Sequence, residues 1–207
     1  MIKIKTALLS VYDKSGIISL AETLIKNHVE ILSSGGTASF LKENGIEVTE
    51  VSDYTGSPEM FGGRVKTLSP YISGGILGQR DKDKAEAKKN NVTWIDLVVC
   101  NLYPFSDVAK NTNSTMDEKI ENIDIGGPTM IRAAAKNFKW VSVVVSPKDY
   151  RSVSAAISNG GLTEKRRFSL AKKAFGHCAE YDQTIFETLS ENCLLYTSPS
   201  PRDDATS

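Results

Sequence analysis

The sequence has little that would point to a charged or lipid surface as its partner. Lys and Arg together number 25, as do Asp and Glu, so the formal net charge is zero and nothing favours nucleic acid or a membrane. No apolar run approaches the roughly 18 residues of a membrane span, and the chain start lacks the long apolar core of a signal peptide. We therefore expect a cytoplasmic globular protein of one domain, or one domain plus an appendage.

Cysteine is also scarce. The three cysteines, Cys100, Cys178 and Cys193, form no metal-ligand spacing and no even disulfide set. We interpret them as reduced thiols, with Cys100 a small core residue. This excludes a disulfide-stapled scaffold and gives no support for a metal site.

Two strand-loop-helix units open the chain. Residues 6–11 form a short apolar run that ends in a polar loop, and apolar residues then recur at helical spacing over 17–25. The pattern repeats with an apolar run at 29–32, a small-residue loop at 33–37 and a helix that Gly45 ends. Two such units within about 45 residues predict a parallel, doubly wound α/β sheet, whose ligands bind outside the carboxyl ends of the strands.

Both loops lie at such carboxyl ends and carry polar side chains, and glycines in the second let backbone N–H groups approach a phosphate. Neither loop matches a Walker or dinucleotide fingerprint, so each alone also fits an ordinary turn with a helix cap. Two such loops at adjacent strand ends favour a phosphate site over that alternative. The candidate residues are Ser10, Asp13, Lys14 and Ser15 in the first loop and Ser34, Gly35, Gly36 and Thr37 in the second.

Residues 53–80 form a long stretch that is punctuated by glycine and proline and has little helical or strand periodicity. Long loops in compact domains are usually functional or disordered. Apolar residues such as Met60 and Phe61 favour an ordered loop, in which Arg64 and Lys66 are cations held for an anionic substrate. The alternative is a solvated basic pair.

The clearest buried strand covers residues 95–100. It places Asn101 and Tyr103 at its carboxyl end, where amide and phenol groups can bind a ligand. Further along, a long helical pattern is expected over residues 162–189, and its His177 is interpreted as structural because no catalytic partner accompanies it.

The other candidate segments are organised around residues 124–137, a turn and short helix with reactive side chains near both ends. Gly126 and Gly127 permit a tight entry into a short helix, and Pro128 suits its first position, where no N–H is needed. The N–H groups of the first turn then form an anion or carbonyl site beside the carboxylate of Asp124.

Lys136 lies at the other end of the same predicted helix. Because helical side chains lean toward the N-terminus, one nucleotide-sized ligand could contact both Lys136 and Asp124. The alternative is an ordinary helix whose terminal lysine is a solvated cation that suits the helix dipole.

Five segments of the chain form a set: Ser10 to Gly16, Ser34 to Thr37, Gly62 to Leu68, Cys100 to Phe105, and Asp124 to Gly127 with Ala133 to Asn137. Together they resemble the inosine monophosphate cyclohydrolase half of the bifunctional purine-biosynthesis enzymes. The resemblance implies a methylglyoxal-synthase-like three-layer α/β fold with a mainly parallel sheet, a homodimer, and no metal or cofactor. It also implies closure of a purine-precursor nucleotide, 5-formamido-4-imidazolecarboxamide ribotide, to inosine monophosphate (IMP) with loss of water.

The resemblance also implies which residues form the site. The family's catalytic lysine corresponds to Lys136, whereas Ser69 and Ser73 depart from the histidines that relatives commonly carry, which affects local details of the pocket. The family's binding segments correspond to Tyr12, Asp13, Lys14, Ser34, Gly35, Gly36, Thr37, Arg64, Val65, Lys66, Thr67, Cys100, Asn101, Asp124 and Ile125. Ser10, Gly126 and Gly127, from the loops described above, complete the predicted substrate contacts.

Ring closure requires the carboxamide nitrogen to attack the formyl carbon. The barrier falls if both ends are held close, the developing oxyanion meets donors and a proton is moved. Our assigned roles are Asp124 and Tyr103 for orienting the carboxamide, Lys66 and the N–H groups near Gly126 and Gly127 for the oxyanion, Lys136 for proton transfer, and Lys14 with residues 34–37 for the phosphate.

Two other classes of function stay open. Methylglyoxal-synthase-like domains also serve as non-catalytic nucleotide sensors that use the same phosphate loops, so the fold alone does not decide. The combination of Arg64 and Lys66 with Tyr103, Asp124 and Lys136 favours the enzyme, because a sensor needs phosphate affinity but no proton-transfer lysine. A third interpretation is an interaction protein that acts through its long C-terminal helix.

The end of the chain differs from the rest. Residues 192–207 are dense in Ser, Thr and Pro and have no periodic apolar face, a composition that does not repay the entropy of ordering. We expect a domain at 1–191 and a disordered tail at 192–207 that resembles translated adapter sequence, with a natural disordered tail as the alternative. Since the family's formyltransferase half is missing from this sequence, ring closure without formyl transfer is expected.

Overall fold

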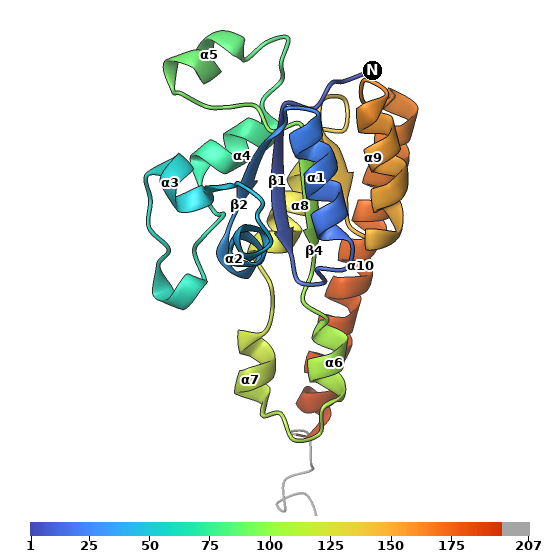
Figure 1. Cartoon of the computed structure of the whole chain (residues 1–207). Helices are drawn as coiled ribbons and strands as arrows, with labels where there is room; N and C mark the ends of the chain where they lie inside the picture. Colours follow the sequence, from blue (N-terminus) through green and yellow to red (C-terminus); the bar gives the residue numbers. More distant parts are fainter. Residues whose placement is uncertain (196–207) are drawn as a thin grey trace, which may run out of the picture. The chain divides into compact units, whose positions relative to one another are not determined.

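The computed structural model describes residues 1–195 of the chain (Figure 1). It divides into two compact units. The first unit comprises Met1–Tyr103 and Asp124–Cys178, and the second comprises Pro104–Ile123 with the described residues from Ala179 onward. No helix within this described part is long and apolar enough to cross a membrane.

The first unit contains the sheet and most of the helices. Its strands are β1 (Thr6–Val11), β2 (Glu30–Ser33), β3 (Thr49–Glu50), β4 (Leu97–Asn101) and β5 (Ser142–Val144). Its helices are α1 (Ile17–Lys26), α2 (Gly35–Glu43), α3 (Val51–Thr55), α4 (Pro70–Leu77), α5 (Lys84–Lys89), α8 (Gly126–Lys136) and α9 (Tyr150–Ser158), with short 3₁₀ turns at Phe61–Gly63 and Pro147–Asp149.

The five strands form one parallel sheet in the order β3-β2-β1-β4-β5. The predicted parallel, doubly wound sheet is thus confirmed. The chain builds the sheet outward from β1 through β2 to β3, and then returns to the other side of β1 with β4. The topological switch point therefore lies between β1 and β4, where ligands of such sheets bind. At this point Val11 pairs with Asn101, so the two strands end side by side.

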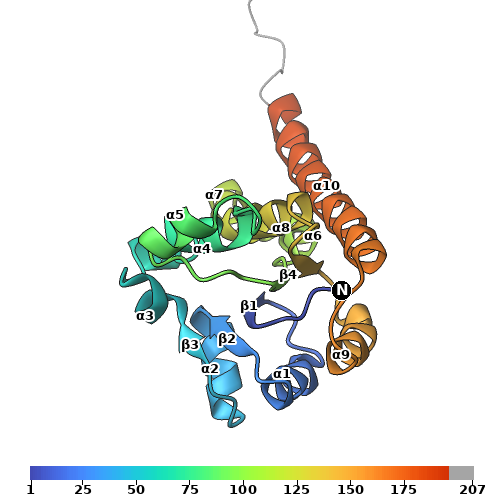
Figure 2. The ribbon, with the colours of Figure 1, turned by 90° about the horizontal axis from the view of Figure 1, so that it is seen from above.

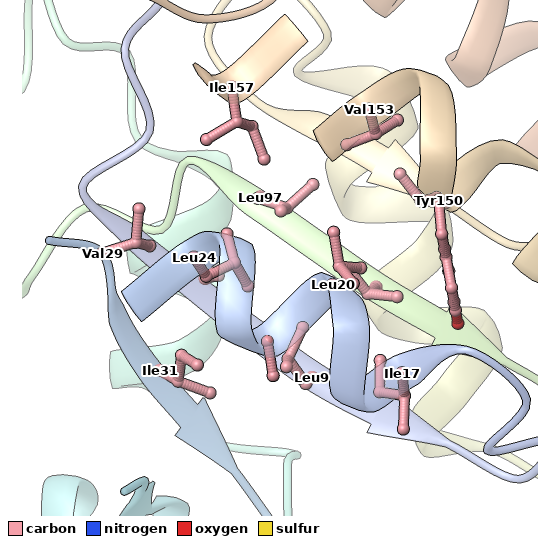
Figure 3. Packing of buried hydrophobic residues seen from close by; sticks show 14 of the residues in the cluster. Leu9, Ile17, Leu20, Leu24, Val29, Ile31, Leu97, Tyr150, Val153 and Ile157 are labelled. Carbon is pink, nitrogen blue, oxygen red and sulfur yellow. The ribbon is translucent and has the colours of Figure 1, made fainter. Parts of the chain in front are cut away.

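Helices cover both faces of the sheet, which gives three layers (Figure 2). Helices α1 and α9 pack together on one face, and α4 and α8 pack together on the other. The buried residues of α1 are spaced as one helical stripe, Ile17, Leu20, Ala21 and Leu24, which is why this segment forms an amphipathic helix. They meet β-strand and α9 residues in the apolar cluster of Figure 3, which includes Leu9, Leu97 and Val153.

The predicted irregular stretch at 53–80 was partly wrong, because it contains the end of α3 and the whole of α4. Two glycines lower the helix propensity of α4, but packing compensates. A Cβ atom added at Gly75 would lie 2.5 Å from the carbonyl oxygen of Thr93, so glycine is what lets this helix approach the following segment. The signal in the sequence was Ser69-Pro70, since Ser69 caps the helix at the N–H of Tyr71.

The second unit consists of α6 (Phe105–Lys110), α7 (Met116–Glu121) and the end of α10, a helix that spans Glu164–Leu195 across both units. A capping box between Thr115 and Glu118 begins α7. Helix α10 runs past the predicted end of the domain at residue 191. Residues 196–207, most of the predicted tail, lie outside the described residues, so that division stays a prediction.

Candidate functional site

A pocket of about 290 Å³ lies at the carboxyl ends of β1 and β4. This volume is at the lower end of those that small-ligand sites occupy. A larger hollow at the amino end of β2 lacks the phosphate loops, so chemistry rather than size identifies the site. The pocket is lined by Ser10, Val11, Tyr12, Lys14, Ser34, Gly35, Gly36, Thr37, Lys66, Cys100, Asn101, Tyr103 and Asp124. Sequence reasoning had named every one of these except Val11.

The loop that follows β1 is held by the side chain of Asn101. Its Oδ1 accepts hydrogen bonds from the backbone N–H groups of Tyr12 (2.8 Å) and Asp13 (2.9 Å), and its Nδ2 donates to the carbonyl of Asp13 (3.0 Å). The Asp13 carboxylate accepts from the N–H of Ser15, and hydrogen bonds from Ser15 lower the pKa of Asp13. Asp13, predicted as a substrate contact, therefore stabilises the loop and does not line the pocket.

Thr37 has a similar tethering role. Its buried hydroxyl accepts from the N–H of Val11 (2.9 Å) and donates to the carbonyl of Val11 (3.0 Å). This ties the start of α2 to the end of β1.

Helix α2 begins at Gly35, earlier than predicted, so Gly35 and Gly36 belong to its first turn, whose N–H groups have no partner within a helix. That helix end and the ammonium of Lys14 make this side of the pocket suitable for a phosphate.

Lys66 reaches the pocket from the loop between α3 and α4. The loop closes on itself through two backbone hydrogen bonds between Met60 and Val65. Glu59 directly precedes Met60 and Lys66 directly follows Val65, so the two side chains lie next to this bridge. The Nζ of Lys66 lies 3.2 Å from Oε2 of Glu59. Glu59 is a residue that sequence reasoning missed, because only the pairing across this loop brings it to Lys66.

Two glycines make room for the Lys66 side chain. A Cβ atom added at Gly35 would lie 2.9 Å from Nζ of Lys66, and one added at Gly63 would lie 2.5 Å from its Cε. Both glycines have positive φ angles, +53° and +91°. Glycine at these two positions therefore serves both the backbone conformation and the path of the lysine.

The other residues predicted in this loop do not line the pocket. Arg64 is exposed and Val65 is half-buried. Thr67 is buried, and its Oγ1 would lie 2.9 Å from a Cβ atom at Gly126. Thr67 thus packs against the start of α8, which joins the loop to the helix that follows Asp124.

Asp124 lies just before α8 and lines the pocket. Its Oδ1 accepts the N–H of Gly127 at 2.9 Å. Burial raises the pKa of Asp124, and the hydrogen bonds from Gly127 and Gly126 only partly oppose this. A Cβ atom at Gly127 would lie 2.5 Å from Cδ2 of Leu102, so glycine is required where the helix begins.

This geometry changes one expectation about α8. The amide of Gly127, assigned to the oxyanion, donates to Asp124 instead. Pro128 is the third helical residue and not the first, because α8 begins at Gly126, but its missing N–H is still unneeded within the first turn.

Two tyrosines form an aromatic wall of the pocket. The rings of Tyr12 and Tyr103 meet edge to face, with centroids 4.5 Å apart. Such a wall suits a flat heterocycle. Cys100 beside them is buried, and burial raises the pKa of its thiol, so it is a neutral core residue, as predicted, and not a nucleophile.

The structure does not bring Lys136 to the pocket. Lys136 is exposed at the last residue of α8, at the opposite end of the helix from Asp124. Ile125 is also exposed and does not line the pocket. The catalytic role of Lys136 therefore stays a prediction. No group of three or more His, Cys, Asp or Glu residues within the described part of the chain is placed to hold a metal ion.

Comparison with known proteins agrees with this architecture. The family model described as MGS-like domain matches residues 16–129, and the family model described as AICARFT/IMPCHase bienzyme matches residues 134–204. Among solved structures, the crystal structure of ForH matches with a TM-score of 0.78 and 36% sequence identity, covering 90% of this chain and 100% of that chain.

Two relatives are each 52% identical to the chain, and both are named bifunctional purine biosynthesis protein PurH. The protein from Neisseria meningitidis serogroup C matches over 194 residues, which is 92% of this chain and 37% of that protein. The protein from serogroup A matches over 204 residues, 95% of this chain and 38% of that protein. The chain thus spans little more than a third of the length of these relatives.

Proposed function

Since the chain belongs to the MGS-like domain family and matches the AICARFT/IMPCHase bienzyme family over residues 134–204, we propose that it is an IMP cyclohydrolase. It closes 5-formamido-4-imidazolecarboxamide ribotide to IMP with loss of water. The observation that carries this proposal is the convergence of phosphate-binding and proton-handling groups on one pocket. The two PurH relatives support the proposal, because each is 52% identical to the chain over little more than a third of its own length.

The phosphate of the substrate binds beside the start of α2. There the first-turn N–H groups and Lys14 offer positive charge, and Ser34 and the glycines allow close approach. The imidazole ring then lies against Tyr12 and Tyr103. This orientation sends the carboxamide and formyl groups toward Asp124 and Lys66.

Ring closure forms a bond between the carboxamide nitrogen and the formyl carbon. Water leaves with the formyl oxygen, one hydrogen from the carboxamide nitrogen and one from the formamide nitrogen. Asp124 accepts a proton from the attacking nitrogen, for which its raised pKa makes it a better base. Lys66 stabilises the charge that develops on the formyl oxygen and gives that oxygen one proton. The proton that the formamide nitrogen loses is the second proton of the leaving water. Tyr103 orients the carboxamide, and Lys136 assists proton transfer.

The test is to mix the purified 207-residue chain with the formylated ribotide and to follow purine absorbance. We expect turnover, and we expect Lys66→Met and Asp124→Asn to lower the turnover number by about 10²-fold or more, which is typical of acid–base groups. If the wild-type chain bound the ribotide without turnover, the proposed cyclohydrolase activity would be refuted and a non-catalytic nucleotide sensor would be favoured.

The assembly and location belong to the same proposal. We propose a homodimer in the cytoplasm, with the domain ending near residue 191. Light scattering on the purified chain tests the first point, and a monomer at the concentrations used for activity would contradict it.

A further inference from the structure

Tyr150 is a buried tyrosine that lies beneath the pocket and has no role in the proposed ring closure. It is the first residue of α9 and is only 5% exposed. Its ring packs under the loop that follows β1, since a Cβ atom at Gly16 would lie 3.5 Å from Cδ2 of Tyr150. In Figure 3 the side chain extends from α9 past Leu20, and its hydroxyl points toward the segment before Ile17.

The hydroxyl of Tyr150 is buried but has no hydrogen-bond partner among the described residues. The side chain of Asn101 faces it without completing the geometry of a hydrogen bond. Burial raises the pKa of the phenol, and the nearby Asp13 and Cys100 raise it further. The hydroxyl therefore stays protonated and can donate as well as accept.

Asn101 is the residue that holds the loop, through three hydrogen bonds to the backbone of Tyr12 and Asp13. Its Oδ1 accepts two hydrogen bonds. Its Nδ2 has two hydrogens and donates one of them to the Asp13 carbonyl. The second hydrogen is available to the Tyr150 oxygen. A hydrogen bond from this Nδ2 to the Tyr150 oxygen would thus link α9 to the loop that carries Lys14.

We propose that Tyr150 is a positioning residue for the phosphate-binding loop, and that its hydroxyl completes a hydrogen bond with Asn101 when a nucleotide phosphate binds beside Lys14. The identity of the ligand rests on the proposed function, whereas the arrangement of Tyr150, Asn101 and the loop does not. In the free protein the unmade hydrogen bond lowers stability, because a buried hydroxyl loses its contacts with water. Phenylalanine would pack the same ring without that cost.

This predicts opposite effects of one substitution on stability and on binding. In Tyr150→Phe we expect the urea midpoint of unfolding to rise. We also expect IMP to bind about three- to tenfold more weakly, as one hydrogen bond is lost only in the bound state. The KM for the ribotide should rise by a similar factor while kcat stays within about twofold.

The matched control is Tyr54→Phe. It removes a hydroxyl that lies away from the pocket and accepts a hydrogen bond from the N–H of Thr93. It should lower stability and leave IMP affinity unchanged.

A second measurement tests whether Tyr150 acts through Asn101. If it does, Tyr150→Phe has little further effect on IMP affinity in an Asn101→Ala background. Unchanged IMP affinity in Tyr150→Phe, or effects of the two substitutions that simply multiply, would overturn the inference while leaving ring closure by the wild-type chain intact. Failure of the wild-type chain to close the ring, with the IMP affinity pattern still observed, would overturn the proposed function alone.

Discussion

Lys66 and Glu59 form an ion pair across a closed loop, with Nζ 3.2 Å from Oε2, at the edge of the candidate pocket. Their side chains are 33% and 41% exposed, so the pair contributes little to stability. Its importance lies elsewhere: the carboxylate of Glu59 competes with any anionic group of a ligand for the same ammonium. The free pocket thus keeps its lysine in place with a charge that the ligand has to displace.

The first prediction concerns this competition. Glu59→Gln should leave the urea midpoint nearly unchanged and strengthen IMP binding at low salt by up to about fivefold. Removing one unit charge some 4 Å away is worth about 1 kcal/mol in water. The gain should shrink as salt screens the pocket. Asp81→Asn is the matched control, because Asp81 pairs with Lys139 and does not line the pocket. Equal IMP affinities for wild type and Glu59→Gln at low salt would show that no competition exists.

The second prediction concerns the glycines beside Lys66. Gly63→Ala should weaken IMP binding and lower turnover, because the new Cβ atom would lie 2.5 Å from Cε of Lys66 and push the side chain aside. Gly62→Ala is a close control, since Gly62 also has a positive φ angle (+64°) but no atom lies within 4 Å of its added Cβ.

Both alanine variants should lose about 1–2 kcal/mol of stability to backbone strain. Only Gly63→Ala should lose binding, as measured by calorimetry with IMP. Equal loss of binding in the two variants would mean that loop conformation, and not the path of Lys66, is what the glycines protect.

The third prediction uses the raised pKa of Asp124. A carboxyl whose pKa is higher in the folded state favours folding below its unfolded pKa, near 3.9, and this contribution is lost as pH rises through the folded pKa. Asp124→Asn should therefore match the wild type in stability below about pH 4 and become more stable than it at higher pH, because Asn keeps the acceptor for the N–H of Gly127.

Urea unfolding of both proteins from pH 3 to pH 8 measures this difference directly. The same variant should lose ring closure by about 10²-fold or more. A variant that is less stable than the wild type at pH 7 would contradict the reading that burial of the charge, and not its hydrogen bonds, dominates at Asp124.

Much of the site could be predicted from local sequence. The strand ends at Val11 and Asn101 follow apolar runs, and the glycines at Gly35 and Gly36 mark a small-residue loop directly after a strand. Because parallel strands end on one edge, these local signals also predict that the loops converge. What local patterns could not give was the division of labour within the site. Thr37 is predicted to bind the ligand and lines the pocket, but its hydroxyl also tethers the start of α2 to the backbone of Val11, a role that no local pattern indicates.

The residues that sequence reasoning missed depend on contacts between distant segments. Glu59 reaches Lys66 only because Met60 pairs with Val65 across a short loop. Tyr150 comes under the pocket only because α9 packs beside α1. Neither contact follows from the periodicity of a single segment. The helix α4 was missed for the opposite reason: its glycines weaken the local helical signal, and close packing against Thr93 replaces it.

The last prediction concerns Lys136, whose role rests on the family resemblance and not on its position. Lys136 is exposed and does not line the pocket, so its removal should not weaken ligand binding. If it moves a proton, its loss has to appear in turnover, and catalytic contacts often tighten only in the ligand complex. We therefore expect Lys136→Ala to lower kcat by more than about tenfold and to leave IMP affinity within about twofold.

Lys139→Ala is the matched control for this test, because Lys139 is an exposed lysine three residues further on that pairs with Asp81. It should change neither quantity. If Lys136→Ala and Lys139→Ala both retain wild-type kcat, then Lys136 has no part in the chemistry, and Lys66 is the lysine that transfers the proton. If Lys136→Ala instead loses IMP affinity, the end of α8 must approach the ligand in the complex, in a way that the free protein does not display.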